Sequence, residues 1–306
     1  MKVTVFGGSG FLGSHSADKL SEAGHEVTIF DIRPSPWLRP DQQMIVGDIL
    51  DDGAVSRAVT GANAVYNYAG LADIGEANLR PVDTAAYNVL GNVKVLEASR
   101  QACVGRFIFA STLYVYGKSG GFYRCSKQAS ELYVEHYRQE YGLEYTILRY
   151  GSLYGPRADR RNGIYKFVRE AMETGVITYY GTPEALRNYI NVEDAAICSV
   201  DILDAAFADT NIVLTGQQSM RVTDLFKMIS EILGRPLQYN FAHDEHSNHY
   251  DITPYAFHPR LGKKMAPRCS VDLGQGLLSI IEDIHRELNP HLNFEMAFPC
   301  RGGPDE

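Results

Sequence analysis

The chain has 306 residues, a formal net charge of −8 at pH 7 and 45% hydrophobic residues. This length suits one large α/β domain with a smaller one attached, and the apolar content is sufficient for a sizeable core. A surface that binds nucleic acid needs clustered positive charge, so the acidic balance argues against a nucleic-acid partner. No apolar stretch approaches the thickness of a bilayer and no secretion signal is apparent, so we expect no membrane partner and a cytoplasmic location.

Short apolar runs alternate with helical patterns through the first half of the chain. Strands are predicted at residues 3–6, 27–30, 44–46, 64–68, 107–110 and 145–149, and helices near 12–22, 51–60, 83–102 and 124–141. This order implies βαβ units and an α/β fold with a doubly wound parallel sheet of the Rossmann type. Ligands of such a sheet bind at the carboxyl ends of its strands.

The regular alternation of strand and helix patterns ends after Pro156. Helices are predicted near 163–174 and 222–233, a strand at 211–214, and an irregular stretch over 235–270. We therefore expect a nucleotide-binding domain over residues 1–156, to which the chain returns around 188–216. Residues 157–306 are expected to form mainly a substrate-binding subdomain.

Three glycines, Gly7, Gly10 and Gly13, lie between the first predicted strand and the first predicted helix. Residues without a Cβ let the backbone approach a phosphate, and the helix that follows offers unpaired N–H groups and the positive end of its dipole. The context of strand, glycines and helix predicts a site for a dinucleotide pyrophosphate. The cofactor-binding residues expected in this turn are Gly7, Gly10, Phe11, Leu12 and Gly13.

Asp31 ends the second predicted strand, eighteen residues after Gly13. An acid at about this spacing binds the ribose 2′-hydroxyl of NAD, and its charge disfavours the 2′-phosphate of NADP. Arg33, two residues further on, could soften this preference. We expect both residues to contact the cofactor, with NAD preferred.

Thr112 follows the fifth predicted strand, and Tyr123 and Lys127 begin the next predicted helix. A tyrosine and a lysine four residues apart share one helical face. A neighbouring ammonium and a cationic nicotinamide both favour the phenolate of a tyrosine whose ordinary pKa is near 10. Tyr123 could then exchange a proton with a substrate hydroxyl that Thr112 holds, while hydride moves to or from the adjacent carbon.

Together these residues resemble the extended short-chain dehydrogenase/reductase family, which contains the NAD-dependent nucleotide-sugar epimerases and dehydratases. The resemblance runs from residue 1 to about residue 235 and is nearest to the UDP-glucose 4-epimerase type. Its landmarks are Gly7-x-x-Gly10-x-x-Gly13, Asp48-Ile49, Ala69-Gly70-Leu71, Asn88-Val89-x-Gly91, Ser111-Thr112-x-x-Val115-Tyr116-Gly117, Tyr123-x-x-x-Lys127, Leu148-Arg149-Tyr150, Tyr154-Gly155-Pro156-Arg157 and Arg187-Asn188-Tyr189-Ile190-Asn191-Val192-x-x-Asp194.

The resemblance implies roles for further residues. Asp48 and Ile49 are expected near the adenine, Ala69 and Gly70 along the ribose and phosphates, and Asn88 in support of the active site. Arg187 stands where the family commonly binds the substrate diphosphate, although a surface ion pair is the alternative. The substrate is expected to contact Ser111, Thr112, Tyr114, Ser152 and Arg187.

Departures from the family pattern bear on the reaction. The resembling dehydratases and decarboxylases carry carboxylates where this chain has Leu113 and Tyr114, so an acid and a base for eliminating water are missing from their usual places. Tyr114 either packs or faces the sugar. Ala72 replaces a lysine usual in the galactose-type 4-epimerases, and Ser152 replaces an asparagine. The short segment 117–122 implies a smaller or more open cap over the sugar, from an unusual substrate or from harmless trimming.

These patterns predict an NAD-dependent epimerase of a nucleotide-linked sugar, acting at carbon 4 of a UDP-hexose or UDP-hexuronic acid through a 4-keto intermediate. One alternative is a net NAD(P)-dependent reductase of a keto-sugar or another carbonyl. Another is a dinucleotide-sensing protein without turnover, although such proteins typically lack the tyrosine and the lysine. The family also implies a homodimer through helices 83–102 and 124–141, whose apolar positions include Tyr87, Val95, Leu132 and Tyr133.

No metal is expected. His243, His246 and His249 recur at every third position, a spacing that matches neither face of a helix cleanly and favours a solvated loop. The widely spaced cysteines form no Cys-x-x-Cys pair, so we expect reduced thiols that serve packing; they are Cys103, Cys125, Cys198, Cys269 and Cys300.

Overall fold

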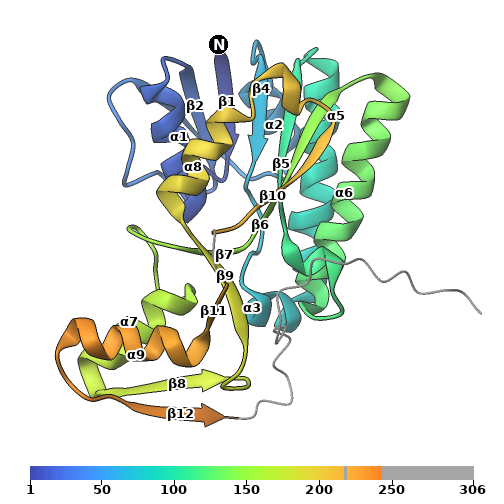
Figure 1. Ribbon diagram of the computed structural model, residues 1–306. Helices are drawn as coiled ribbons and strands as arrows, with labels where there is room; N and C mark the ends of the chain where they lie inside the picture. The colour runs from blue at the N-terminus through green and yellow to red at the C-terminus, as the bar shows by residue number, and fades with distance from the viewer. Residues whose placement is uncertain (217–218, 243–306) are drawn as a thin grey trace, which may run out of the picture. The chain divides into compact units, whose positions relative to one another are not determined.

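A sheet of seven parallel strands organises the protein, whose computed structural model describes residues 1–216 and 219–242 (Figure 1). The strand order is β10-β6-β5-β4-β1-β2-β3. Their bounds are β1 Lys2–Phe6, β2 Glu26–Asp31, β3 Gln42–Val46, β4 Ala64–Asn67, β5 Arg106–Thr112, β6 Glu144–Tyr150 and β10 Thr210–Leu214. The chain moves outward from β1 in one direction and from β4 in the other, so the carboxyl ends of these two neighbours flank the crevice where such sheets bind ligands. The predicted Rossmann-like sheet is confirmed.

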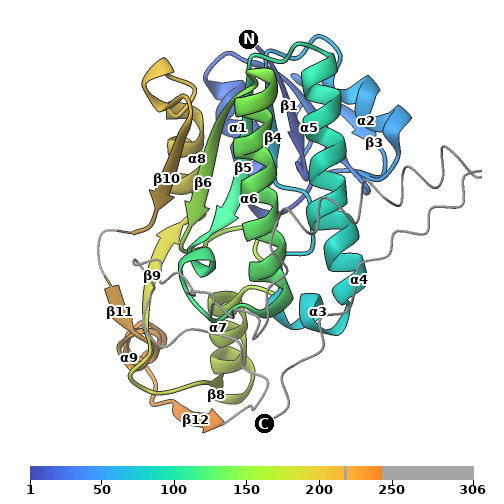
Figure 2. The same ribbon diagram turned by 90° about the vertical axis from the view of Figure 1, so that its right-hand side faces the viewer.

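Helices cover both faces of this sheet (Figures 1 and 2). Helices α1 (Phe11–Glu22) and α8 (Val192–Asp201) pack on one face. Helices α2 (Asp52–Val59), α5 (Gly91–Gln101) and α6 (Gly121–Tyr141) pack on the other. Because successive strand residues point to opposite faces, both faces need apolar side chains, which explains the continuous apolar runs.

The strands β1 and β5 illustrate this division. Val5 joins the core under α1 and α8, whereas Phe6 joins the core under α2, α5 and α6. In β5, Ile108 points to the first core, and Phe107 and Phe109 point to the second. All five side chains are at most 1% exposed. Burial on both faces fixes the register of these strands and therefore the position of the residues at their ends.

A second, smaller core lies in the latter part of the described chain. It is built by α7 (Gly163–Thr174), α9 (Val222–Leu233) and the parallel pair β8 (Val176–Tyr180) and β12 (Gln238–Ala242). The ring of Phe167 lies 5.1 Å from that of Phe226 and 5.8 Å from that of Tyr179. The prediction of irregular structure is wrong for 238–242, because that segment gains its strand form by pairing with distant β8. A three-stranded sheet joins β11 (Ser219–Arg221), β9 (Leu186–Asn191) and β7 (Ser152–Tyr154).

The predicted helix 83–102 is interrupted. Helix α3 (Ile74–Leu79) comes before it. The predicted helix itself consists of the end of α4 (Pro81–Thr84), a π-helical segment η1 (Ala85–Leu90) and then α5. Such π segments are rare and occur often at functional sites. This one carries the buried Asn88, whose amide bonds both backbone groups of Leu71 and the hydroxyl of Ser126. The short helices η2 (Leu113–Tyr116) and η3 (Ala205–Phe207) and helix α8 were also not predicted.

The described cysteines are free thiols. Cys198 is partly buried, but Cys103 and Cys125 are exposed, so the expected packing role is wrong for these two. Cys269, Cys300 and the three histidines 243, 246 and 249 lie outside the described residues. Among the residues that the structure describes, no helix is long and apolar enough to cross a membrane, and no cluster of three or more His, Cys, Asp or Glu side chains could hold a metal.

Candidate active site

The glycine turn after β1 brings three pieces of backbone into close approach. A Cβ on Gly7 would lie 2.6 Å from the amide nitrogen of Ala69, and a Cβ on Gly13 would lie 2.2 Å from the carbonyl oxygen of Gly7. Gly7 also has a φ of +75°, which disfavours a side chain. Helix α1 begins at Phe11, and its N-cap is Gly10, which has no side chain that could accept the amides of the first turn. The amides of its first turn therefore offer a cradle that fits a pyrophosphate.

Asp31 lies at the end of β2, beside this turn. Its carboxylate accepts hydrogen bonds from the amides of Ser9 at 3.1 Å and Arg33 at 3.2 Å. The carbonyl of Arg33 in turn accepts the hydroxyl of Ser9, while the Arg33 residue is exposed. These bonds hold the acid at the edge of the glycine turn, where a ribose attached to a bound pyrophosphate would lie.

The remaining expected cofactor residues follow β3 and β4. The carboxylate of Asp48 accepts the amide of Leu50 at 2.9 Å, and Ile49 is 6% exposed. Ala69 and Gly70 continue from β4, and Gly70 has a φ of +145°. A Cβ on Gly70 would lie 2.4 Å from the side-chain oxygen of Asn88. Asn88 thus holds the loop after β4 against α6, and only Gly70 of these five lines the cavity described next.

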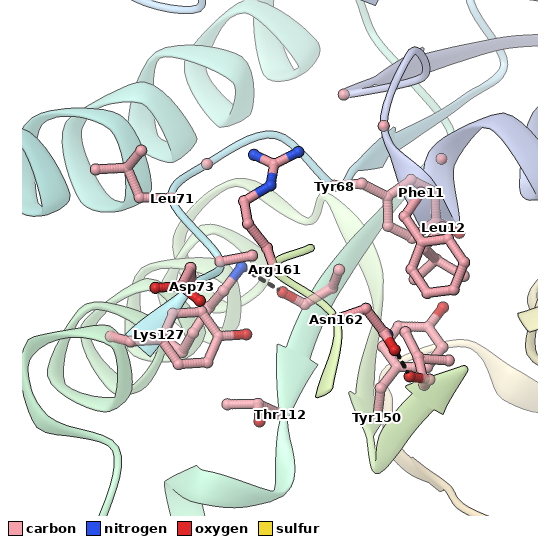
Figure 3. Close-up of a pocket in the computed structure, with 18 of the residues that line it drawn as sticks. Phe11, Leu12, Tyr68, Leu71, Asp73, Thr112, Lys127, Tyr150, Arg161 and Asn162 are labelled. Carbon is pink, nitrogen blue, oxygen red and sulfur yellow. Dashed lines mark hydrogen bonds between the residues drawn. The ribbon is translucent and has the colours of Figure 1, made fainter. Parts of the chain in front are cut away.

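A cavity of about 350 Å³ opens at the carboxyl ends of β1, β4, β5 and β6 (Figure 3). The predicted site residues that it brings together are Gly7, Gly10, Phe11, Leu12, Gly13, Gly70, Ser111, Thr112, Tyr123 and Lys127. Predicted residues outside its described lining are Asp31, Arg33, Asp48, Ile49, Ala69, Asn88, Tyr114, Ser152 and Arg187. One continuous space therefore connects the glycine turn with the tyrosine and the lysine.

Thr112 and Tyr123 are neighbours in the lining of the cavity. Thr112 ends β5, and Tyr123 lies in the first turn of α6, which begins at Gly121. A side-chain hydrogen bond joins the two residues. Burial raises the pKa of Tyr123 to about 12, and the bond to Thr112 opposes this rise. With a pKa of about 12 the phenol keeps its proton at neutral pH, and further positive charge, such as that of a bound nicotinamide, would favour the phenolate.

Lys127 is 6% exposed and lies one turn after Tyr123 on α6. Its ammonium donates to the carbonyl of Ala110 at 2.8 Å and lies 5.8 Å from the centre of the Tyr123 ring. Burial lowers the pKa of Lys127 to about 8, while the negative charge of Glu131 raises it. The amine is therefore mostly protonated at neutral pH, and it loses its proton within about one pH unit above neutrality.

The four expected substrate residues other than Thr112 have different surroundings. Ser111 lines the cavity, but its hydroxyl donates to Glu131. The ring of Tyr114 packs edge-on against that of Tyr123, with centroids 6.4 Å apart. Ser152 begins β7 and is half-buried. Arg187 is 7% exposed and donates to the hydroxyl of Tyr179, in the smaller core.

Several residues that line the cavity were not among the predicted site residues. They are Tyr68, Leu71, Ala72, Asp73, Glu76, Ala110, Tyr150, Gly151, Leu153, Asp159, Arg161 and Asn162. Tyr68, Tyr150 and Gly151 directly follow or end sheet strands, so their position at strand ends was a usable signal. Asp159, Arg161 and Asn162 come from an irregular segment before α7, for which no sequence pattern indicated a role.

The sequence model of the NAD dependent epimerase/dehydratase family matches residues 3–214. A putative UDP-glucose 4-epimerase of Methanocaldococcus jannaschii is 28% identical over 253 residues, covering 76% of this chain and 82% of that protein. The structure of Thermus thermophilus UDP-glucose 4-epimerase with NAD has a TM-score of 0.76 at 26% identity, covering 85% of this chain and 91% of that one. A UDP-glucose 4-epimerase of Thermotoga maritima with UDP-glucose also gives 0.76 at 26% identity, covering 94% and 100%.

A Rossmann-type sheet with a glycine turn and a Tyr-x-x-x-Lys pair on the cavity defines the class of short-chain dehydrogenase/reductase proteins. The chain belongs to the NAD-dependent epimerase/dehydratase family. The family and the cofactor predicted from the sequence are thereby confirmed.

The depressed pKa of Lys127 predicts a pH dependence of stability. Folded Lys127 releases its proton near pH 8, whereas an unfolded lysine keeps it up to about pH 10.5. Between these values the unfolded state binds more protons, so the contribution of Lys127 to the free energy of unfolding rises with pH. The unfolding free energy of the wild type minus that of Lys127→Met should rise by up to about 3 kcal/mol from pH 8 to 10.5.

Urea denaturation at a series of pH values measures this difference. Lys227→Met is the matched control, because the Lys227 side chain is 67% exposed. Its difference from the wild type should stay flat over the same range. A flat difference for Lys127→Met as well would contradict the burial effect.

Proposed function

We propose that the protein is an NAD-dependent epimerase of a nucleotide-linked sugar, acting at carbon 4 of a UDP-hexose or UDP-hexuronic acid. The observation that carries the proposal is the joint placement of Thr112, Tyr123 and Lys127 on the cavity that also holds the glycine turn. The UDP-glucose 4-epimerases to which the chain is similar support the choice of reaction and of nucleotide.

The three residues have complementary roles in the proposed reaction. Tyr123 takes the proton of the 4-hydroxyl, and Thr112 hydrogen-bonds the same region of the substrate. Lys127, as an ammonium, lowers the cost of charge on the phenol oxygen. Bound NAD supplies the hydride acceptor and donor. In this proposal the resulting 4-keto sugar turns within the cavity and presents its other face, and Tyr123 then returns the proton.

The surroundings of Thr112 support epimerisation over elimination. Leu113 is fully buried and Tyr114 packs on Tyr123, so the segment that follows Thr112 brings no carboxylate to the sugar. Removal of water or carbon dioxide by the family's usual route needs an acid or base there.

The carboxylates among the described lining residues are already engaged. Asp73 accepts the amide of Glu76 as the N-cap of α3. Glu76 pairs with Arg80 at 2.6 Å, and Asp159 pairs with Arg161 at 2.5 Å. The hydrogen bond from Arg161 lowers the pKa of Asp159, which makes this carboxyl a poor proton donor at neutral pH.

The remaining cofactor and substrate roles are part of the same proposal. Phe11, Leu12 and the three glycines would bind the pyrophosphate, Asp31 the ribose with Arg33 beside it, and Asp48 and Ile49 the adenosine side. Ala69, Gly70 and Asn88 would shape the loop along the cofactor. Ser111, Tyr114, Ser152 and Arg187 remain the candidate substrate contacts. We also propose a cytoplasmic location, which the free thiols Cys103, Cys125 and Cys198 support because thiols stay reduced there.

An epimerase returns its hydride, so the purified protein should interconvert two sugars of equal mass over many turnovers without added nicotinamide. We would incubate it with UDP-linked glucose, galactose, N-acetylglucosamine and glucuronic acid and examine the products by proton NMR and mass spectrometry. Tyr123→Phe should lower turnover by about two to four orders of magnitude while NAD still binds, because the proton acceptor is lost.

Matched controls and opposing outcomes make this test decisive. Tyr141→Phe, at an exposed position at the end of the same helix, should keep wild-type turnover. A product lighter by water or carbon dioxide would overturn the epimerase assignment, as would a strict need for added reduced cofactor. A Tyr123→Phe variant within a few-fold of wild type would remove Tyr123 from the mechanism.

We also propose a homodimer through η1, α5 and α6. Of the apolar positions expected at this interface, Val95 is fully buried in the chain's own core, and Tyr87 packs against that core. Leu132 and Tyr133 are 67% and 45% exposed. Leu90 on neighbouring η1 is 51% exposed, which gives the α5 and α6 side shown in Figure 2 an apolar character.

Leu132→Glu should convert a dimer into a monomer, because two copies of the new charge would be buried at a two-fold contact. Sedimentation velocity at micromolar concentration measures the change. Met172→Glu, at a 60% exposed position on α7, is the control and should stay dimeric. A monomeric wild type would contradict the proposed assembly.

A further inference from the structure

A buried ion pair lies directly behind the proposed catalytic residues. Glu131 on α6 and Arg149 on β6 have side chains that are 8% and 14% exposed. The guanidinium binds the carboxylate through two bonds, at 3.0 Å and 2.7 Å. The described lining of the cavity includes neither residue, so the proposed reaction does not use them directly. A buried pair of this kind is weak evidence for stability, because desolvation offsets much of the attraction.

The pair connects two backbone segments on either side of Thr112. The hydroxyl of Ser111, the residue before Thr112, donates to Glu131 at 2.5 Å. On the other side, Arg149 donates to the hydroxyl of Tyr116 at 2.7 Å, and its guanidinium lies 4.8 Å from the centre of that ring. Tyr116 ends η2, the short helix that begins immediately after Thr112. The strand end that carries Thr112 is therefore fastened both before and after that residue.

The pair also bears on the charge of Lys127. Glu131 lies four residues after Lys127, on the same face of α6. Its carboxylate opposes the effect of burial, which lowers the pKa of Lys127 to about 8. Among the described residues, the Lys127 ammonium also contacts the ring of Tyr123 on α6, and on β5 the carbonyl of Ala110 and the ring of Phe109. The groups bonded to Glu131 or to its partner are Arg149 on β6, which pairs with Glu131, and Tyr116 on η2, which accepts from Arg149.

We propose that Glu131 is a positioning residue that holds the ammonium of Lys127 in its charged form and, with Arg149, fixes the strand end that carries Thr112. Its catalytic consequence rests on the proposed function, but its effect on Lys127 does not. Arg149 balances the negative charge of Glu131, so the two residues act on Lys127 in opposite directions.

The two partners therefore predict opposite results on substitution. Glu131→Gln removes the negative charge and leaves Arg149 unpaired, so the pKa of Lys127 should fall by roughly one pH unit. Arg149→Met removes the positive charge and leaves the carboxylate, so the pKa of Lys127 should rise. Glu131→Asp keeps the charge and should leave the titration of Lys127 within a few tenths of the wild-type value.

Carbon-13 NMR of the lysine Cε resonances across a pH series, on the full chain saturated with NAD, measures these values. Lys127→Met assigns the resonance. Glu135→Gln is the matched control, one turn further along α6, where Glu135 accepts a bond from Asn211; it should not move the titration. A purely structural role for the pair would lower thermal stability in both single variants and leave the Lys127 titration unmoved or displaced in one direction, which would overturn the proposal.

Activity then separates this inference from the proposed function. For a sugar that is turned over, the alkaline limb of kcat/KM should move to lower pH in Glu131→Gln and to higher pH in Arg149→Met. A titration that moves as expected without turnover of any sugar would support the role of Glu131 and count against the epimerase. Turnover of a sugar with a Lys127 titration that the substitutions do not move would support the epimerase and count against the role of Glu131. If Glu131→Gln fails to fold, the rise expected for Arg149→Met tests the proposal alone.

Discussion

The burial of the Lys127 ammonium between α6 and β5 is the constraint on which the site depends. A charged amine in this position needs a partner, and the carbonyl of Ala110 supplies it at 2.8 Å. That bond ties the first turns of α6 to the last residues of β5. Because Tyr123 is one turn from Lys127 and Thr112 is two residues from Ala110, the same bond places the two hydroxyl groups together. The position of α6 on β5 and the proposed chemistry thus both depend on the hydrogen bond between Lys127 and Ala110.

The sheet places the Lys127–Ala110 bond close to the glycine turn. Parallel strands end at one edge, so the glycine turn after β1 and the polar residues after β5 open on the same cavity, with β4 between them. Close backbone contact between Gly7, Gly13 and Ala69 leaves no room for side chains at this point. The glycine turn and the side chains of Thr112, Tyr123 and Lys127 are therefore positioned by regular elements, which limits their movement relative to each other.

The parts of the fold and site that depend on local spacing could be predicted from the sequence. The apolar runs of the central strands, the glycine turn and the pair Tyr123 and Lys127 are of this kind, because burial and helical periodicity act over a few residues. Features that depend on distant partners could not. Strand β12 exists through its pairing with β8, and the π segment that directs Asn88 toward Leu71 has no local signal. The irregular segment that brings Arg161 to the cavity follows no periodicity either.

The central claim is that hydride leaves carbon 4 and returns to the same carbon within one site. A nucleotide sugar that the protein turns over, labelled with deuterium at carbon 4, tests this most directly. Proton NMR and mass spectrometry of the products should show both epimers, each with the deuterium retained at carbon 4 and with no loss to water over many turnovers. Hydrogen in place of deuterium at that carbon would contradict the claim, because it would mean that the carbon exchanges with solvent or with a free reductant.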